Sequence, residues 1–580
     1  METILCKEDK KMDPIRNRIK MAVDTLGRLR YSQRMPVEGV RVCDGTYDFH
    51  EQISMEAFAS MDVRPYGRDE TWGGRDRHYW FLAQVDPARE GRDRERRVIL
   101  NTGDTDLWNT DNPQIMVYVD GNFKGTMDMN HQELILDDPQ KEHSLAFYAY
   151  SNNRARTNFF HLDTAFYEED VARLYYDLKV PFEAGDLLLE EDLERIQAWK
   201  ILNACVGMID FRYPGTEAFY KSVEEAEAFI QEQYYKTRKE CPVVVHSIGH
   251  THIDVAWKWP LKQTRQKAVR SFNTVLNLMD RYPEYRFMSS QPQLYEFVKE
   301  EAPRLFERIK EKMKEGRWEA EGAAWVEPDC NLSSGESLVR QILYGRRFFE
   351  KELGASPNEV LWLPDVFGYS AAMPQILKKS GISYFMTTKI SWNEYNKFPY
   401  DTFMWRGIDG SEVLSYLITT KDYDKNPDGK DPSFNTTYNG RQNVSQVMGT
   451  WQRYQNKDVS QDVLTCFGHG DGGGGPTEEM LEESRRMEFG VARCPRTRQT
   501  FVKEFFHLLE ERMDRKRLPS WSGELYLEFH RGTYTSMAKN KWYNRKSEFL
   551  CGDGELYSVM AMELADGFAY PKKELDDNWK

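Results

Sequence analysis

The stretch VVVHSIGHTHIDVAW, residues 243–257, begins with the apolar run of a buried strand and continues into a group of polar side chains. It places His246, His250, His252 and Asp254 within nine positions, although the 580-residue chain has only 11 histidines. Side chains alternate between the two faces of a strand, so an extended chain would point these four even-numbered residues the same way.

Beyond residue 241 this apolar run is the first of several that alternate with candidate helices, as in VLWLP followed by AAMPQILKKS. A strand, a crossover helix and a further strand predict parallel pairing, and hence a β/α barrel or a doubly wound domain. Ligands of such folds bind at the carboxyl ends of the strands, so the candidate functional residues are those that directly follow each strand.

The chain as a whole predicts a multidomain α/β protein, because 580 residues exceed one ordinary core. Helical spacing marks residues 1–35, and helical patterns return over 166–240. Between them, over 36–165, short runs rich in Val, Tyr and Phe alternate with turns, which predicts an antiparallel β-sandwich with a hairpin turn at Asp120-Gly121. We assign residues 241–515 to the β/α domain, with a barrel-like set of mostly parallel strands.

Composition restricts the class of partner and the compartment. The net charge of −14 disfavours nucleic acid and acidic membranes, and no segment has the length of a membrane span. The N-terminus lacks a signal-peptide pattern, and the eight cysteines include no C-x-x-C pair, which indicates reduced thiols in the cytoplasm. The basic run at 89–97 contains acids as well and predicts a solvated loop.

The imidazoles and the carboxylate in H250-T-H252-I-D254 are the ligand types that a divalent metal uses, and they follow the first strand of the β/α region. The alternative is a strand-end histidine that only bonds the backbone. Trp257 comes next; its indole suits stacking on a sugar ring, although packing in the core is an equally common use.

Two further strand ends carry carboxylates. In EVLWLPDVFGYSAAMPQIL, residues 359–377, Asp365 precedes the expected helix by five residues, so capping explains it poorly, and a nucleophile, a base or a metal ligand fits better. In CFGHGDGGGGPTEEM, residues 466–480, the glycines would let the backbone approach a ligand while presenting Asp471. A mobile surface loop is the alternative there. A dinucleotide site is disfavoured, because no acidic residue ends a following strand.

Four motifs between residues 249 and 536 resemble glycoside hydrolase family 38, the α-mannosidases, and they occur in the family's order. They are GHTHIDVAW, LWLPDVFGYSAAMPQIL, FGHGDGGGGPT and LYLEFHRGTYTS. Their wording is most similar to the branch with cytosolic and bacterial members. The resemblance also implies that residues 516–580 begin a helical bundle, and that the C-terminal β domains usual in the family are absent from a truncated chain.

The resemblance implies a role for individual residues. A divalent metal, most commonly Zn²⁺ in the family, would be held by His252, Asp254, Asp365 and His530. Asp365 would also be the nucleophile, and Asp471 is the candidate general acid and base. The residues expected to contact or support the substrate are Trp257, Phe367, Asp329, His250 and His469; among these, His250 would orient the metal ligands.

The function implied by the resemblance is a retaining exo-α-mannosidase that forms a covalent glycosyl-aspartate and binds the mannose 2- and 3-hydroxyls through its metal. Its substrate would be an α-mannoside oligosaccharide, with no nucleic-acid or membrane partner, and a homo-oligomer is left open. Two alternatives remain: a zinc-dependent amide hydrolase on a barrel, and an inactive truncated fragment that binds sugar. The absence of histidine between 252 and 469 disfavours the amide hydrolase.

Overall fold

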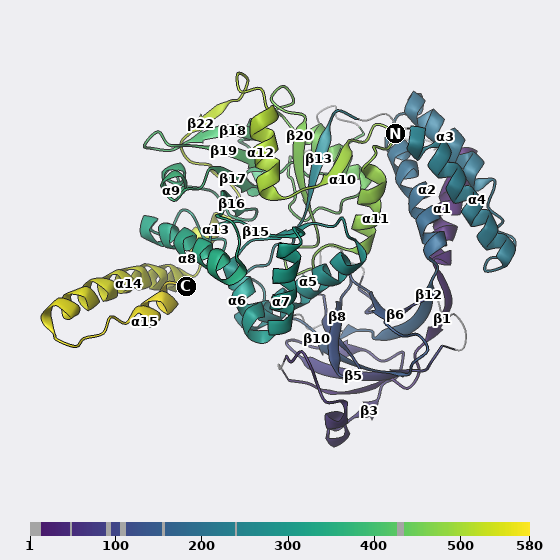
Figure 1. The fold of residues 1–580 in the computed structure, drawn as a ribbon, viewed down its shortest axis with the longest axis horizontal. Coiled ribbons are helices and arrows are strands. Elements are labelled where there is room, and N and C mark those ends of the chain that lie inside the picture. Colours follow the sequence, from purple (N-terminus) through teal and green to yellow (C-terminus); the bar gives the residue numbers. More distant parts are fainter. Residues whose placement is uncertain are drawn as a thin grey trace, which may run out of the picture.

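The computed structural model describes residues 13–46, 49–88, 94–104, 112–153, 157–237, 241–425 and 434–580. Residues 89–93 of the predicted basic loop lie outside the described residues, but residues 95–97 belong to strand β6(Glu95–Asn101) and Arg97 is buried, so the prediction of a solvated loop is wrong there. Figure 1 shows a β-rich N-terminal part, a group of helices beside it, a larger α/β part and a projecting C-terminal pair of helices. The protein therefore has a mixed α/β fold with several β-sheets.

Two antiparallel sheets make up the N-terminal β region. One has the order β1(Tyr31–Pro36)-β12(His161–Tyr167)-β6(Glu95–Asn101)-β9(Glu133–Leu136). The other has the order β3(Arg64–Pro65)-β2(Arg41–Asp44)-β5(His78–Val85)-β10(His143–Tyr150)-β7(Gln114–Val119)-β8(Asn122–Met127). A small pair joins β4(Trp72–Gly73) and β11(Thr157–Asn158), and a 3₁₀ turn, η1, covers Met55–Ser60.

Apolar side chains of both sheets form one core cluster, with Val98 and Leu162 from the first sheet and Phe81 and Val117 from the second. The predicted hairpin is confirmed: β7 and β8 pair on either side of Asp120-Gly121, whose φ angles are 51° and 81°. Two consecutive left-handed residues match the right-handed twist of the flanking strands, which is why Asp-Gly is favoured there.

Four helices pack beside this region: α1(Pro14–Leu29), α2(Glu169–Leu187), α3(Leu193–Val206) and α4(Glu217–Gln233), followed by a 3₁₀ turn η2(Tyr235–Thr237). The Asp13 side chain accepts a hydrogen bond from Arg16 N and so caps α1. Helices are therefore present in both predicted helical segments, although β1 begins before residue 36. The division into domains stays a prediction.

The α/β part contains two mainly parallel sheets. Their orders are β15(Trp318–Ala320)-β14(Phe287–Ser289)-β13(Val244–Gly249)-β20(Asp462–Phe467), with β21(Arg496–Gln499) also on β13, and β16(Val360–Leu363)-β17(Tyr384–Thr387)-β19(Glu412–Leu417)-β18(Thr402–Arg406)-β22(Ser520–Ser522). Helices follow the strands: α5(Leu261–Arg281), α6(Pro292–Glu301), α7(Pro303–Lys314), α8(Gly335–Leu353), α9(Met373–Lys379), η3(Lys389–Trp392), α10(Val444–Arg453), α11(Glu478–Met487) and α12(Val502–Arg512). Among the described pairings of these sheets, β18–β19 is the antiparallel one, so the predicted parallel character is confirmed.

The two parallel sheets approach each other at two places. A parallel bridge joins Gly322, just after β15, to Leu361 of β16. On the other side, Leu464 N of β20 donates to the Tyr416 hydroxyl of β19 at 2.8 Å. These contacts bring the carboxyl ends of the strands to one region of the molecule. Closure of the strands into a barrel stays a prediction.

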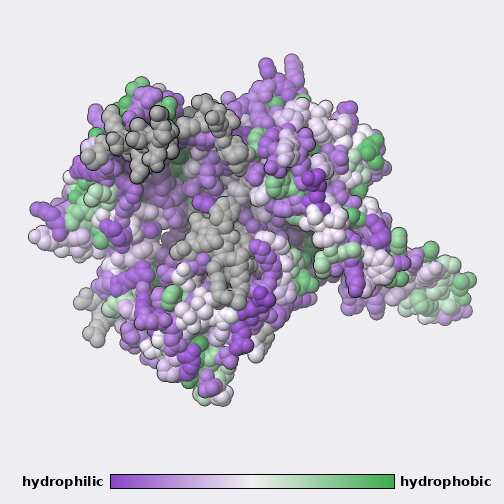
Figure 2. Space-filling view, turned by 180° about the vertical axis from the view of Figure 1, so that it is seen from behind, coloured by the Kyte–Doolittle hydropathy of each residue, from purple (hydrophilic) through white to green (hydrophobic). Residues whose placement is uncertain are grey.

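The C-terminal helices α13(Gly532–Thr535), α14(Ala538–Leu564) and α15(Lys572–Trp579) follow the α/β part. The α14–α15 pair projects from the molecule, and apolar residues gather on it (Figures 1 and 2). Arg340 of α8 bonds Glu555 of α14 at 2.8 Å, which attaches the pair to the α/β part. No helix within the described ranges has both the length and the apolar content to cross a membrane.

Candidate active site

The quoted stretch places only part of its polar group at the site, because regular strand geometry ends at Gly249. His246 is buried inside β13, where it bonds Asp462 at 2.8 Å and Thr500 at 3.0 Å. His250 is also buried; its Nδ1 bonds Met288 O at 3.0 Å, and Trp362 Nε1 lies 3.3 Å from its Nε2. Burial lowers the pKa of His250 to about 3, so this imidazole is neutral.

His252, Asp365 and Asp471 converge at the carboxyl ends of β13, β16 and β20. Each offers one nitrogen or oxygen, and these three atoms all lie within 4.8 Å of one another. His252 Nε2 is 3.6 Å from Asp365 Oδ2 and also 3.6 Å from Asp254 Oδ1. Four of the predicted site residues, His252, Asp254, Asp365 and Asp471, therefore lie together although they come from three separate segments of the chain.

The donors fit one divalent cation. His252 Nε2 and Asp254 Oδ2 are buried, and neither has a hydrogen-bond partner among the described residues. Leaving such atoms unpaired costs free energy, which a bound cation would remove. Two donors that bind one Zn²⁺ at about 2.0–2.2 Å in tetrahedral geometry lie about 3.4 Å apart, close to the spacing around His252.

Glu327, which follows β15, orients the imidazole of His252. Its Oε1 lies 2.8 Å from His252 Nδ1, so Nδ1 carries a proton and Nε2 faces the carboxylates. The pKa of Glu327 is raised by burial, while His252 opposes the rise. The sequence assigned this orienting role to His250, but the hydrogen bonds of His250 lead to Met288 and Trp362.

Asp365 has a second neighbour that the sequence reasoning missed. Lys389, the first residue of η3 after β17, places its Nζ 2.7 Å from Asp365 Oδ1. The lysine is buried and its ammonium lies 4.0 Å from the centre of the Trp392 ring. The rule of examining each strand end would have found it, because KISW, residues 389–392, directly follows the strand-like run ISYFMTT, residues 382–388.

Asp471 sits in the glycine-rich turn with φ of 54°. The Tyr438 hydroxyl donates to its Oδ1 at 2.9 Å, and Asn439 Nδ2 donates to its Oδ2 at 3.0 Å. Burial raises the pKa of Asp471; His252 opposes the rise and the Asp365 carboxylate adds to it. A carboxyl group that keeps its proton to higher pH is suited to general acid catalysis.

His530 lies near this cluster but outside the group of atoms within 4.8 Å found among the described residues. It is exposed, its φ is 61°, and its ring centre is 4.7 Å from that of Phe367. Metal binding by His530 therefore stays a prediction. The Phe367 ring is partly buried, and its carbonyl accepts a hydrogen bond from Tyr534 at 2.6 Å.

Three other predicted residues surround the cluster less directly. Trp257 is 51% exposed, with Lys258 Nζ 4.1 Å from its ring centre. Asp329 Oδ1 accepts hydrogen bonds from the backbone of Asn331 and Leu332, as in a turn. His469 packs edge-on to His131 with 6.2 Å between ring centres. Their contacts with substrate stay predictions.

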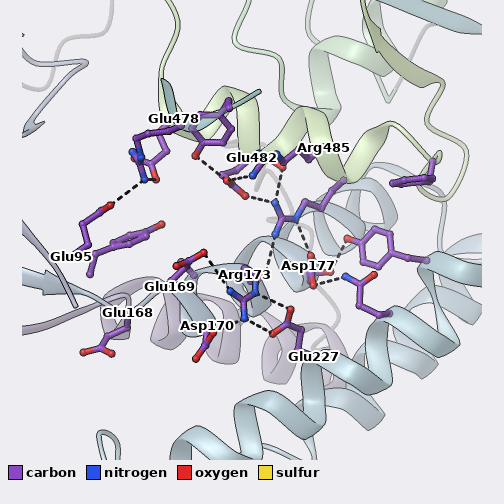
Figure 3. Close-up of a pocket in the computed structure, with 18 of the residues that line it drawn as sticks. Glu95, Glu168, Glu169, Asp170, Arg173, Asp177, Glu227, Glu478, Glu482 and Arg485 are labelled. Carbon is purple, nitrogen blue, oxygen red and sulfur yellow. Dashed lines mark hydrogen bonds and ion pairs between the residues drawn. The ribbon is translucent and has the colours of Figure 1, made fainter. Parts of the chain in front are cut away.

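A pocket of about 860 Å³ lies elsewhere, between α2, α4, α11 and β12 (Figure 3). The charged side chains that line it pair with one another: Arg173 bonds Glu227 at 3.0 Å and Arg486 bonds Asp177 at 2.8 Å. In these two pairs the opposite charges compensate each other. The cluster at the strand ends, where the buried His252 Nε2 and Asp254 Oδ2 have no hydrogen-bond partner among the described residues, is the stronger candidate for an active site.

The segment that holds this cluster has relatives among known proteins. Residues 242–524 match the model of the glycosyl hydrolases family 38 N-terminal domain. Alpha-mannosidase G of Dictyostelium discoideum is 32% identical over 90% of this chain and 47% of its own length. Alpha-mannosidase 2C1 of Homo sapiens is 38% identical over 72% of this chain and 38% of its own length.

Among solved structures, an alpha-mannosidase from Enterococcus faecalis V583 superposes with a TM-score of 0.48 at 19% identity, over 58% of this chain and 37% of that one. The chain spans less than half the length of the two curated relatives. All four quoted motifs begin within residues 242–524 or directly after them. From the family model and these relatives, we conclude that the chain belongs to glycoside hydrolase family 38.

Proposed function

We propose that the chain carries the active site of a retaining exo-α-mannosidase that hydrolyses α-mannosidic bonds of oligosaccharides with one bound Zn²⁺. The observation that carries the proposal is the convergence of His252, Asp365 and Asp471 within 4.8 Å, inside the segment that matches the family 38 model. The names of the relatives support the substrate class.

The proposed metal ligands are His252, Asp254 and Asp365, with His530 as the fourth. His252 presents Nε2 because Glu327 holds Nδ1, and the two aspartates offer oxygens 3.6 Å from that nitrogen. A Zn²⁺ ion bound there would act as a Lewis acid toward the 2- and 3-hydroxyls of the mannose. No other cofactor is proposed.

In the proposed reaction, Asp365 attacks the anomeric carbon while Asp471 donates its proton to the leaving glycosidic oxygen. A glycosyl-aspartate forms and the first alcohol product leaves. Asp471 then accepts a proton from water, whose oxygen displaces Asp365 and releases mannose. The oxygens of the two carboxyl groups come within 4.8 Å, which supports retention, because inverting enzymes separate the two groups by about 6.5–9.5 Å.

The proposal also includes expectations about substrate contacts, barrel closure, cellular location and assembly. We expect Trp257, Phe367, Asp329, His250 and His469 to contact or support the sugar, and we expect the parallel strands to close into a barrel-like ring. The cytoplasmic location and the homo-oligomer remain predictions, as do the domain limits near residues 35, 165, 240 and 515.

The test is hydrolysis of an aryl α-mannoside by the purified chain. We expect turnover that disappears with a chelator and returns with zinc. Asp365→Ala should abolish turnover and lower metal affinity, because one ligand is lost, while Asp409→Ala, in an exposed turn, should change neither. Cleavage of amides without mannosides would support the amide hydrolase. A chain that binds metal normally but turns over no mannoside would be the sugar-binding fragment.

A further inference from the structure

The N-terminal β region reaches across to the turn that carries Asp471. We call residues 128–131, just after β8, the β8 loop, and residues 468–476 the glycine-rich turn. These two segments are more than 330 positions apart in the chain. Side chains of the β8 loop contact backbone carbonyl groups of the glycine-rich turn. A side chain of α5 contacts the same turn.

Three hydrogen bonds hold backbone carbonyl groups of the glycine-rich turn, at Gly472, Gly473 and Pro476. Asn130 Nδ2 donates to Gly473 O at 3.2 Å, and His131 Nε2 bonds Pro476 O at 2.9 Å. Arg270 of α5 donates to Gly472 O at 2.9 Å, and its other terminal nitrogen bonds Asp128 Oδ2 at 3.2 Å. Asp128 also bonds His131 Nδ1 at 3.1 Å, so the β8 loop and Arg270 form one network.

This network is buried, which makes its hydrogen bonds costly to lose. The side chains of Asp128 and Arg270 are 1% and 2% exposed. Burial alone would lower the pKa of His131, but the Asp128 carboxylate raises it above its ordinary value. Both ring nitrogens face acceptors, a carboxylate oxygen of Asp128 and the carbonyl oxygen of Pro476. Opposite charges inside the protein compensate each other here, and breaking such a network leaves unpaired buried groups.

The glycine-rich turn needs an external support. Asp471 has φ of 54°, and Gly472, Gly474 and Gly475 have φ of 80°, 92° and 91°. A left-handed aspartate is uncommon and its conformation persists only where the surroundings hold it. The contact is also close: a Cβ added to Gly474 would lie 2.8 Å from the His131 ring.

The far end of the turn is anchored to the same region. Glu478, at the start of α11, bonds Arg97 of β6 at 3.0 Å and Arg281 of α5 at 2.7 Å. Tyr438 and Asn439, which lie outside the turn in the α/β part, hold the carboxylate of Asp471. The side chain of Asp471 is thus held from the α/β part, whereas the backbone that follows it is held at Gly472 by α5 and at Gly473 and Pro476 by the N-terminal β region.

We propose that Asn130 and His131 are positioning residues: the β8 loop holds the backbone of the glycine-rich turn so that Asp471 points at the glycosidic oxygen. The N-terminal β region then takes part in catalysis without touching the substrate. This inference rests on the proposed function for its kinetic consequence, whereas the support of the turn is a property of the fold.

The first experiment measures amide hydrogen exchange of residues 468–476. His131→Ala and the milder Asn130→Ala should each raise exchange there by about tenfold or more. His143→Ala is the matched control, because His143 is also buried between a carboxylate, Asp120, and a carbonyl, Asp138 O, in the same region. Unchanged exchange in the turn for both variants, or an equal rise in the control, would overturn the inference. This arm needs no activity.

The second experiment compares kcat/KM for two α-mannosides, one with an activated dinitrophenol leaving group and one with a sugar leaving group. Misplacing the acid should lower kcat/KM about tenfold for the sugar and less than about twofold for the dinitrophenol. Equal losses for both would show a merely structural role and refute the positioning role. If the unaltered chain cleaves neither substrate, the proposed function fails, and the exchange measurement still decides whether the β8 loop supports the turn.

Discussion

Lys389 Nζ lies 2.7 Å from Asp365 Oδ1, while the other oxygen, Oδ2, lies 3.6 Å from His252 Nε2. The two side chains of this ion pair are only 8% and 15% exposed. Lysine and metal would therefore use different oxygens of the same carboxylate. Contacts at both oxygens would restrict rotation of the group and keep the proposed nucleophile aligned for attack.

Lys389→Met should destabilise the metal-free chain, because it leaves the Asp365 carboxylate buried without that cation. Breaking a buried ion pair costs about 3–5 kcal/mol, and bound zinc should reduce the loss by supplying another charge. Urea unfolding with and without zinc measures this. Lys397→Met, at an exposed lysine bonded to Asn393 O, should change the free energy of unfolding by less than about 0.5 kcal/mol. An equal loss of unfolding free energy with and without zinc would contradict the inference that lysine and zinc bind the same Asp365 carboxylate.

Glu327→Gln should weaken zinc binding about 10- to 100-fold, because the partner of a metal-binding histidine sets its tautomer and basicity. Calorimetric titration of zinc into the metal-free protein, prepared with a chelator that is then removed, gives the zinc affinity. The matched control is Glu359→Gln, which alters another glutamate–histidine pair, 2.8 Å from His507, on the surface. Unchanged zinc affinity in Glu327→Gln would remove Glu327 as the orienting residue.

Asp471→Asn should remove the alkaline limb of the pH profile for substrates with poor leaving groups. The acid works only while protonated, and burial raises the pKa of Asp471, so kcat/KM should fall as pH rises through that raised value. With an activated aryl mannoside, whose leaving group needs no proton, kcat/KM should fall only slightly at high pH. A limb that persists in the variant would assign it to another group.

Glu478→Gln tests the anchor at the start of α11. Burial by itself would raise the pKa of Glu478. The nearby Arg97 and Arg281 outweigh burial and lower this pKa from 4.5 to about 2. A depressed carboxyl pKa stabilises the fold above the unfolded value, and this contribution is lost as pH falls from about 4.5 toward 2. The shift corresponds to about 3 kcal/mol.

In urea unfolding, the variant should therefore be less stable than the unaltered chain at pH 7, and the difference should shrink below about pH 4.5. Glu488→Gln, at an exposed residue at the other end of the same helix, serves as the control. A difference that does not change between pH 7 and pH 3 would mean that the stabilisation does not come from the charge of Glu478.

Much of the architecture could be predicted from local patterns. Period-two runs and helical spacing are properties of consecutive residues, so the β7–β8 hairpin and the mainly parallel strands from β13 onward were predictable. The rule that ligand-binding residues follow strand ends selected Asp365 and Asp471 as candidates, and the structure brings both into one cluster. The even-number argument for the first strand failed beyond Gly249, because alternation of side chains holds only while the backbone remains a regular strand.

By itself, then, the sequence determined which residue types follow which strands, and through four motifs it indicated the family. Only the tertiary structure decided the partners: Glu327 for His252, Lys389 for Asp365, and the β8 loop for the turn that holds Asp471. The physical reason is that local periodicity sets the direction of a side chain relative to its own backbone. The group that it meets comes from a distant segment, and the packing of whole elements brings that segment into place.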